Sequence, residues 1–461
     1  MIKTPNFNMT KRLILTFQIS LLIFCSASAQ KLTLEQCLER AKQNNYELRK
    51  AALDMEAATE QKREAFTNYF PRISANVMAF RLFDELIKAD GILPPEISML
   101  SPQLAPLAGM PISIAELNRG YAVAGMLVQP LFHGGQIVYG NKLARVQQDV
   151  MALKSQLTEK EVLQKVTECF WQLACVRYNL SSVEAAEKQM AAVQEQVENF
   201  LKAGVTTRNS LLKVRLRIQE LSSKRLKLEN SDHVLRLLLA QQIGIEPAEA
   251  DKNFDILLEE KPIEQPIETT EGQLTLSPDH REELQLLGKA VEAQELQVKM
   301  ERGKYLPHLA VGLAGYHTGI GGFSRMVKNY LPTSMNNGLV FGTLSIPISD
   351  WWGGNYAMKR QKIKLQQARS DRENARQMLQ IDIERAWTNL QENYKQIQIA
   401  QTSQEQAAEN LRMTTDQYRM STCTLTDLLD AETLNRQAQD DLAKAKANYQ
   451  IALADYRRKS H

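Results

Sequence analysis

The chain has 461 residues, of which 24% are charged, and its formal net charge is only +3. This small excess lies in residues 1–29, which contain Lys3, Lys11 and Arg12 and no acidic residue. The rest of the chain is neutral, which excludes the clustered basic surface of a nucleic-acid-binding protein.

Residues 1–29 have the pattern of a secretory signal peptide. Lys11-Arg12 precedes an apolar run from Leu13 to Phe24 that is too short to span a bilayer. Ala27-Ser28-Ala29 supplies the small residues that a signal peptidase needs. We therefore expect export and cleavage before Gln30, and the alternative is an uncleaved anchor helix.

The cysteines do not indicate a disulfide, redox or metal site. Lipidation at Cys25 is not expected, because Phe24 stands where a lipoprotein has a small residue. Cys169 and Cys175 are six apart in a helical pattern, about 240° around the axis, so they cannot pair within that helix. No Cys-x-x-Cys or His/Cys ligand spacing occurs, and the cysteines after the signal segment are predicted to be small core residues: Cys37, Cys169, Cys175 and Cys423.

The chain repeats itself. Asn68-Tyr69-Phe70-Pro71 recurs in the second half as Lys304-Tyr305-Leu306-Pro307, and the pair Trp171 and Tyr178 recurs at a similar offset as Trp387 and Tyr394. This indicates two structural repeats, 30–275 and 276–461, built to one plan.

Each repeat is predicted to contain a helix, a strand pair, a long helix and a last helix. The long helices contain no proline, and 68 residues would reach roughly 100 Å. Apolar residues recur at steps of three and four along them, which is coiled-coil spacing. In chain order the elements are helix 33–66, strand pair 72–129, long helix 136–203, helix 208–244, linker 245–275, helix 279–303, strand pair 308–346, long helix 355–420 and helix 425–459.

The predicted strands alternate as half-buried strands do. Ile73, Ala75 and Val77 fall on one face, and each stretch has about ten residues, the length of a tilted membrane strand. After the signal segment no run of 18 apolar residues occurs, so a membrane role would require strands. Four strands leave open edges, so several chains would have to pool them. The alternatives are soluble hairpins and a coiled-coil scaffold protein.

Six ordered motifs extend over essentially the whole chain after residue 29. They are Leu32-Thr-Leu-Glu-Gln, Pro130-Leu-Phe-His-Gly-Gly135, Ala203-Gly-Val-Thr-Thr207, Ile243-Gly244, Pro347-Ile-Ser-Asp-Trp-Trp-Gly-Gly354 and Asp427-Leu-Leu-Asp-Ala431. Together these motifs resemble the TolC-like outer-membrane efflux proteins. The resemblance implies a mainly α fold with a small β part: a homotrimer with a twelve-stranded β-barrel in the outer membrane, on an α-helical coiled-coil tunnel in the periplasm. It also implies a passive exit duct that serves a periplasmic adaptor (membrane fusion) protein and an inner-membrane pump, in efflux or type I secretion, without a cofactor.

The resemblance assigns roles to the two helix-to-helix turns of the chain. Gly204 suits a left-handed helix stop, whereas Ser421 stands where the family usually has Gly, so the second turn is not expected to be identical. The residues expected to dock the adaptor are Gly204, Val205, Thr206, Thr207, Ser421, Thr422, Cys423 and Thr424. An ordinary helical hairpin loop is the alternative.

The same resemblance places an aperture and a gate near these turns. Asp427 and Asp430 share a helix face and would line the aperture as rings of carboxylates, or else lie on a solvated face. Tyr418 matches a gating tyrosine, but Cys423 and Ser210 replace its usual arginine and aspartate partners. A gate would therefore need another bond network, with Arg208 as a candidate, and core packing of Tyr418 is the alternative.

Two other classes of function fit the sequence less well. The histidines show no metal-ligand spacing, and neither a phosphate loop nor a Gly-x-Ser-x-Gly elbow occurs, so no catalytic residue is expected. A periplasmic coiled-coil adaptor or scaffold without a pore is the alternative function. The sequence does not indicate the transported substrate or the class of pump.

Overall fold

The computed structural model describes residues 30–81, 91–92, 102, 111–112, 119–246, 254–258, 278–324, 329–349 and 351–460. The predicted signal peptide and most of residues 82–118, within the predicted strand pair 72–129, lie outside these residues. The described chain forms two compact units. One contains the main sheet and the helical residues 56–150 and 287–371, and the other contains the remaining helices.

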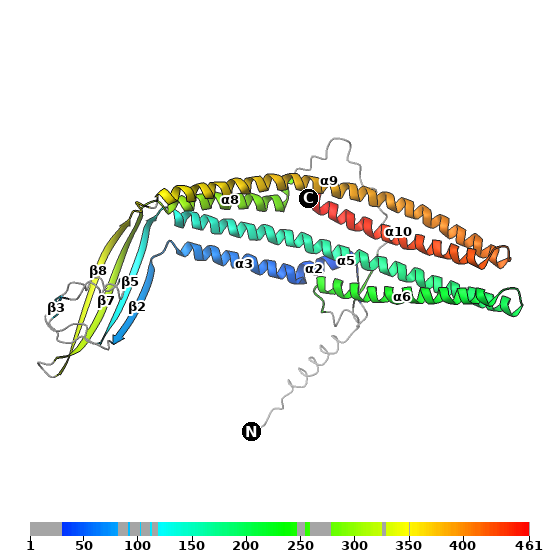
Figure 1. The fold of residues 1–461 in the computed structure, drawn as a ribbon, viewed down its shortest axis with the longest axis horizontal. Helices are drawn as coiled ribbons and strands as arrows, with labels where there is room; N and C mark the ends of the chain where they lie inside the picture. The colour runs from blue at the N-terminus through cyan, green and yellow to red at the C-terminus, as the bar shows by residue number, and fades with distance from the viewer. Residues whose placement is uncertain are drawn as a thin grey trace, which may run out of the picture. The chain divides into compact units, whose positions relative to one another are not determined.

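The sheet is formed by the strand pairs of the two repeats. Its strands are β2 (Arg72–Arg81), β5 (Arg119–His133), β7 (His308–Ser324) and β8 (Asn329–Ser345). They lie side by side in the order β2-β5-β7-β8, with every neighbouring pair antiparallel (Figure 1). Within the described residues, β2 and β8 therefore each have a hydrogen-bonded partner on one side only.

The strands are longer than predicted in three of the four cases. β7 and β8 have 17 residues each, and their ladder runs on to the pair Ser324 and Asn329. The stretch from Gly319 to Gly322 resembles a turn in the sequence, but ladder hydrogen bonds need only backbone groups, so pairing continues through it.

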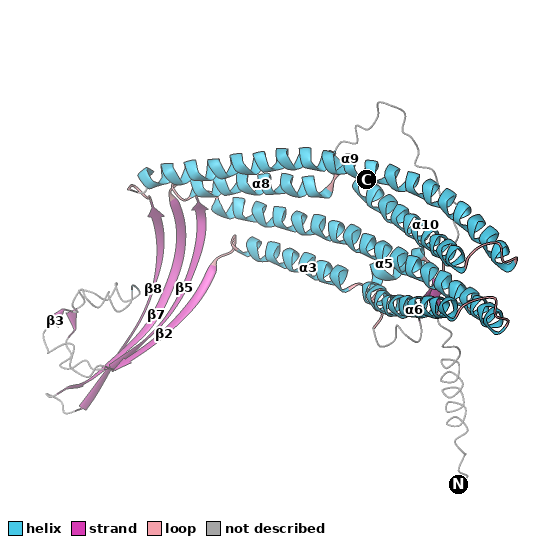
Figure 2. Cartoon of the chain, turned by 45° about the vertical axis from the view of Figure 1, so that its right-hand side comes forward, coloured by secondary structure: helices cyan, strands magenta, loops and turns pink. Residues whose placement is uncertain are grey.

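Helices fill most of the rest of the chain. In the first repeat they are α2 (Leu34–Asn44), α3 (Tyr46–Thr67), α5 (Gln136–Lys202) and α6 (Arg208–Gln242). In the second they are α8 (Glu282–Gly303), α9 (Trp351–Arg419) and α10 (Leu425–Ser460), with a 3₁₀ turn at Pro278–His280. Figure 2 shows that α5 and α6, and likewise α9 and α10, form hairpins.

The single helix predicted at 33–66 is wrong, because the chain breaks at Asn45. This residue is 4% exposed and has extended backbone angles. Its side-chain oxygen accepts hydrogen bonds from the backbone N–H groups of Glu47 and Leu48, which caps α3. Its Nδ2 donates to the carbonyl oxygen of Gln242 at 2.7 Å, so the break also attaches α2 to the end of α6.

Part of the predicted linker 245–275 is a strand. β6 (Phe254–Ile256) pairs in parallel with β1 (Gln30–Leu32). Leu32, Phe254 and Ile256 are buried in a core with residues of α2, α5 and α6. Arg177 of α5 forms an ion pair with Asp255 of β6 and another, at 3.0 Å, with Asp232 of α6, so it joins the strand to both helices.

The second Gly-Gly pair was expected to precede a helix at 355, but α9 already begins at Trp351. Gly354 therefore lies inside the helix. A side chain would not fit there, because the ring of Tyr305 lies 2.7 Å from an added Cβ. Among the described helices none is both long enough and apolar enough to cross a membrane.

Candidate functional site: two helical turns and an open sheet

The turn between α5 and α6 stops the first helix with a left-handed residue. Gly204 has φ +74°. The N–H of Val205 donates to the carbonyl of Phe200 at 2.9 Å, and the N–H of Gly204 donates to that of Leu201 at 3.1 Å. This pair of bonds is a Schellman motif. Thr207 then caps α6 by accepting from the N–H of Ser210.

The turn between α9 and α10 has the same bonds. The N–H of Thr422 donates to the carbonyl of Gln417 at 2.9 Å, and the N–H of Ser421 to that of Tyr418 at 3.0 Å. Ser421 has φ +59° and is the one described non-glycine residue with a positive φ. The expectation that serine would change this turn is therefore wrong, because the two bonds of the motif hold serine in the left-handed region at a cost of roughly 1 kcal/mol.

The residues predicted to dock an adaptor lie together on these two turns and are mostly exposed. Val205 is 67% exposed, and the neighbouring Met420 is 66% exposed. Thr206 and Cys423 are half-buried, while the other six are exposed: Gly204, Val205, Thr207, Ser421, Thr422 and Thr424. Each turn thus carries one large exposed apolar side chain beside polar ones.

Asp427 has a structural role within the chain. Its carboxylate accepts hydrogen bonds from the backbone N–H and the hydroxyl of Thr424, at 2.9 and 2.7 Å. Its own N–H donates back to the Thr424 hydroxyl at 3.2 Å, which completes a capping box at the start of α10. The hydrogen bonds from Thr424 lower the pKa of Asp427. Asp430, one turn on, is exposed.

The structure does not bring the two predicted gate residues together within one chain. Tyr418 is 7% exposed, and its ring centroid is 6.3 Å from that of Phe200 in the core of the helical ends. Burial raises the pKa of Tyr418. Arg208 is exposed at the start of α6. Cys423 donates to the carbonyl of Thr414 at 3.5 Å instead of replacing the missing arginine.

A polar contact between α6 and α10 was not anticipated from the sequence. Arg217 donates to the carboxylate of Glu432 at 2.9 and 2.6 Å, and Glu432 is only 1% exposed. Arg217 also donates to the hydroxyl of Thr433 at 2.7 Å. The signal that could have revealed this contact is the basic character of one α6 face, which has an acidic counterpart on the last helix of the second repeat.

Two further contacts lie along the same two helices, and together with the contacts of Arg217 they form a row that we call the α6–α10 seam. Lys213 donates to the hydroxyl of Thr426 at 3.1 Å, near the turns. Lys224 forms an ion pair with Asp440 farther along. The partners follow one another in the same order on both helices, so α6 and α10 run parallel and in register.

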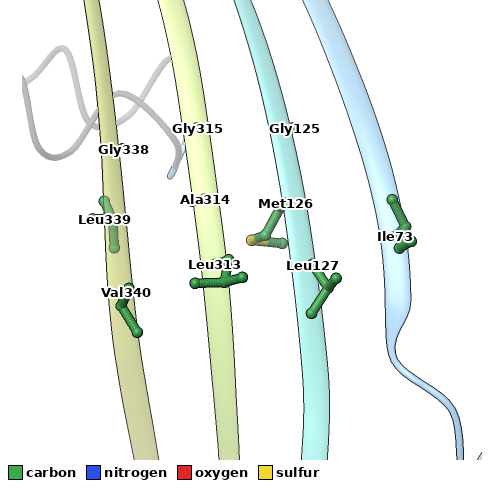
Figure 3. A pocket seen from close by; sticks show the side chains of 10 residues that line it. All are labelled: Ile73, Gly125, Met126, Leu127, Leu313, Ala314, Gly315, Gly338, Leu339 and Val340. Atoms are coloured by element: carbon green, nitrogen blue, oxygen red, sulfur yellow. The ribbon is translucent and has the colours of Figure 1, made fainter.

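The sheet exposes an apolar face. Ile73, Val77 and Val340 are 78, 74 and 79% exposed. On the same face Gly125, Gly315 and Gly338 stand in register on three strands and form a shallow groove beside Leu127 and Leu313 (Figure 3). Polar side chains, among them Ser74 and Asn76, belong to the opposite face, as strand alternation requires.

Comparison with known proteins identifies the class of fold. Residues 277–458 match the family model described as outer membrane efflux protein. This matched part, which is less than half of the chain, is similar to that family. The predicted family resemblance is thereby confirmed, and it favours the predicted outer-membrane location.

Solved structures extend the similarity to the whole described fold. The outer membrane protein VceC of Vibrio cholerae has 15% identity and a TM-score of 0.72, over 93% of this chain and 95% of its own. The Campylobacter jejuni CmeC outer membrane channel gives 15% and 0.72, over 93% and 85%. The Neisseria gonorrhoeae MtrE outer membrane channel gives 16% and 0.66, over 93% and 88%. Among curated proteins, no sequence match reaches significance.

Proposed function

We propose that this chain is a channel subunit of the outer membrane and that three copies form one duct. The observation that carries the proposal is the antiparallel four-stranded sheet, in which β2 and β8 have free edges among the described strands. Free strand edges in lipid leave backbone groups without hydrogen bonds, which costs several kcal/mol each. Three copies, joined β2 to β8, would close a twelve-stranded barrel and leave no edge.

The two faces of the sheet support this arrangement. The face with Ile73, Val77 and Val340 would meet lipid, since burying exposed apolar surface there is favourable. The face with Ser74 and Asn76 would line the water-filled interior. The helices would continue the duct into the periplasm.

The two helical turns would dock a periplasmic adaptor, which would join the duct to an inner-membrane pump. They offer exposed side chains on rigid Schellman turns, so little entropy would be lost on binding. The solved structures that the fold resembles are described as outer membrane proteins and channels, which favours a passive exit duct. Efflux pumps and type I secretion systems would both fit such a duct.

Asp427 and Asp430 would line the aperture at the end of the duct. Three copies would place six carboxylates there, an arrangement that attracts cations. The capping box fixes the Asp427 carboxylate in its ionised form, because it accepts two hydrogen bonds from Thr424. A gate made of Tyr418 and Arg208 would have to form between copies, because one chain does not join them.

Fractionation and bilayer recording test this function. The mature chain should sediment with the outer membrane, require detergent for extraction and conduct ions when reconstituted in a planar bilayer. A chain that follows the inner membrane and conducts nothing would instead be an adaptor or a scaffold protein.

A further inference from the structure

The internal duplication makes the α6–α10 seam a template for a contact between chains. One constant offset in the numbering makes the turns of the two repeats equivalent, so that Gly204 corresponds to Ser421 and Thr207 to Thr424. α6 and α10 are therefore equivalent helices that lie beside each other in one chain. If the step from α6 to α10 within one chain is repeated from α10, it leads to the α6 of another copy. A head-to-tail contact of this kind forms a ring when its rotation returns to the first copy.

The seam within the chain uses one face of each helix. On α6 it is formed by residues three and four apart, which share a helix face. These are Lys213, Arg217, Glu220 and Lys224, and three of them contact α10 directly. On α10 the receiving residues are Thr426, Glu432, Thr433 and Asp440.

The numbering offset between the two turns identifies a second face on each helix, which takes no part in the seam within the chain. The residues of α10 equivalent to the donating face of α6 are Asp430, Leu434, Gln437 and Asp441. The residues of α6 equivalent to the receiving face of α10 are Asn209, Arg215, Leu216 and Ser223. In the single chain all eight are exposed, whereas Glu432, at the receiving face within the chain, is buried.

The two free faces are complementary at three levels. Leu434 and Leu216, which are 56 and 62% exposed, take the places of Arg217 and Thr433. Asp430 takes the place of Lys213 and would meet Asn209, an amide donor. Asp441 takes the place of Lys224 and would meet Ser223, a hydroxyl donor. The ion pair of Arg217 with Glu432 has no ionic counterpart between chains, because Arg215, the equivalent of Glu432, forms an ion pair with Glu198 of its own chain at 3.2 Å.

We propose that α10 of one copy packs parallel and in register against α6 of a second copy, through Leu434 against Leu216, with Asp430 against Asn209 and Asp441 against Ser223 on either side. The partner is a second copy of this chain. The proposal rests on the proposed trimer and adds the residues that join its helical ends. Ion-paired seams within chains and leucine-centred seams between chains would alternate around the ring. Lys213 stays exposed in its seam, so Asp430 would also keep contact with water, consistent with an aperture nearby.

Disulfide trapping tests this register. In full-length protein with Cys423→Ser, we expect Leu216→Cys together with Leu434→Cys to give covalent dimers and trimers on a non-reducing gel after oxidation. The control pairs Leu434→Cys with Leu226→Cys, another exposed α6 leucine, which lies about 15 Å along the helix and should give no product. A trimer on a native gel in which the Leu216 pair fails to cross-link would overturn the seam and leave the proposed function standing.

A second pair of variants covers the case in which the cysteines prevent assembly. Leu216→Arg alone and Leu434→Asp alone should each lose the trimer on a native gel, and the double variant should regain it, since the introduced charges would pair. Trimers that tolerate both single changes, or a double variant that stays monomeric, would contradict the seam. A wild-type chain that is itself monomeric in detergent would instead refute the proposed trimer.

Discussion

The left-handed backbone of Ser421 predicts that glycine at this position would stabilise the turn between α9 and α10. Its φ of +59° lies in the left-handed region, which glycine adopts without a steric penalty. Ser421→Gly should therefore remove a cost of roughly 1 kcal/mol from the turn between α9 and α10. The reverse change, Gly204→Ser, should add a similar cost at the equivalent turn. A Cβ at Gly204 meets nothing within 4 Å, so the backbone alone would account for that effect.

Hydrogen exchange measures this effect locally in the intact protein. The N–H groups of Ser421 and Thr422 are held by the Schellman bonds, so their exchange reports opening of the turn. A stabilisation of about 1 kcal/mol should slow exchange about fivefold in Ser421→Gly, since about 1.4 kcal/mol corresponds to tenfold. Gly204→Ser should speed exchange at Gly204 and Val205 to a similar extent. Unchanged or faster exchange in Ser421→Gly would show that serine is not strained there.

Three further predictions concern the same helices. Arg217→Met should destabilise the helical ends by about 3–5 kcal/mol, because the buried Glu432 carboxylate loses both hydrogen bonds from Arg217 and keeps only Arg436, 4.0 Å away. Arg217→Met with Glu432→Met should recover most of that loss in thermal unfolding, and equal losses in both variants would contradict the seam. The pKa of Asp427 is lowered in the folded chain, so the stability that its capping box contributes is present above the unfolded pKa of about 4 and disappears as pH falls through the lowered value. The protection factors of the amides at the start of α10, which compare the observed exchange rate with the intrinsic rate at the same pH, should fall in acid in the wild type and be low at all pH values in Asp427→Asn. Asp427→Asn with Asp430→Asn should reduce the cation preference of single-channel currents several-fold, and an unchanged reversal potential in a salt gradient would exclude these carboxylates from the aperture.

The sequence was sufficient to predict the features that arise from periodicity. The long helices α5 and α9 were predicted because apolar residues recur at steps of three and four along most of their length and no proline interrupts them. The strands were predicted from alternation, and the duplication supported both. A periodic pattern summed over many residues outweighs single exceptions.

The features that the sequence did not predict depend on single residues or on distant partners. The break at Asn45 needs one amide to cap α3 and bind Gln242, which lies at the far end of the first repeat. The pairing of β1 with β6 likewise joins the two ends of that repeat, and such short strands carry no periodic signal. Ser421 adopts a conformation against its own preference because the two backbone bonds of the Schellman motif hold it there.

The candidate site likewise contains features that the sequence predicted and features that it did not. The two turns were located from the break between the predicted helices, from Gly204 as a helix stop and from the family resemblance. The role of Asp427 in a capping box was not predicted, although it follows from a local rule for helix-starting threonines applied to Thr424. The ion pairs of Arg217 and Lys224 could not be located, because the facing of two helices from different hairpins is set by packing rather than by local preference.

The mass of the detergent-extracted assembly tests the central claim most directly. Native mass spectrometry of mature protein taken from the outer membrane should give three times the mass of one chain, since only several copies can pair the free edges of β2 and β8. A stable single chain in lipid, carrying the same four strands, would contradict the account.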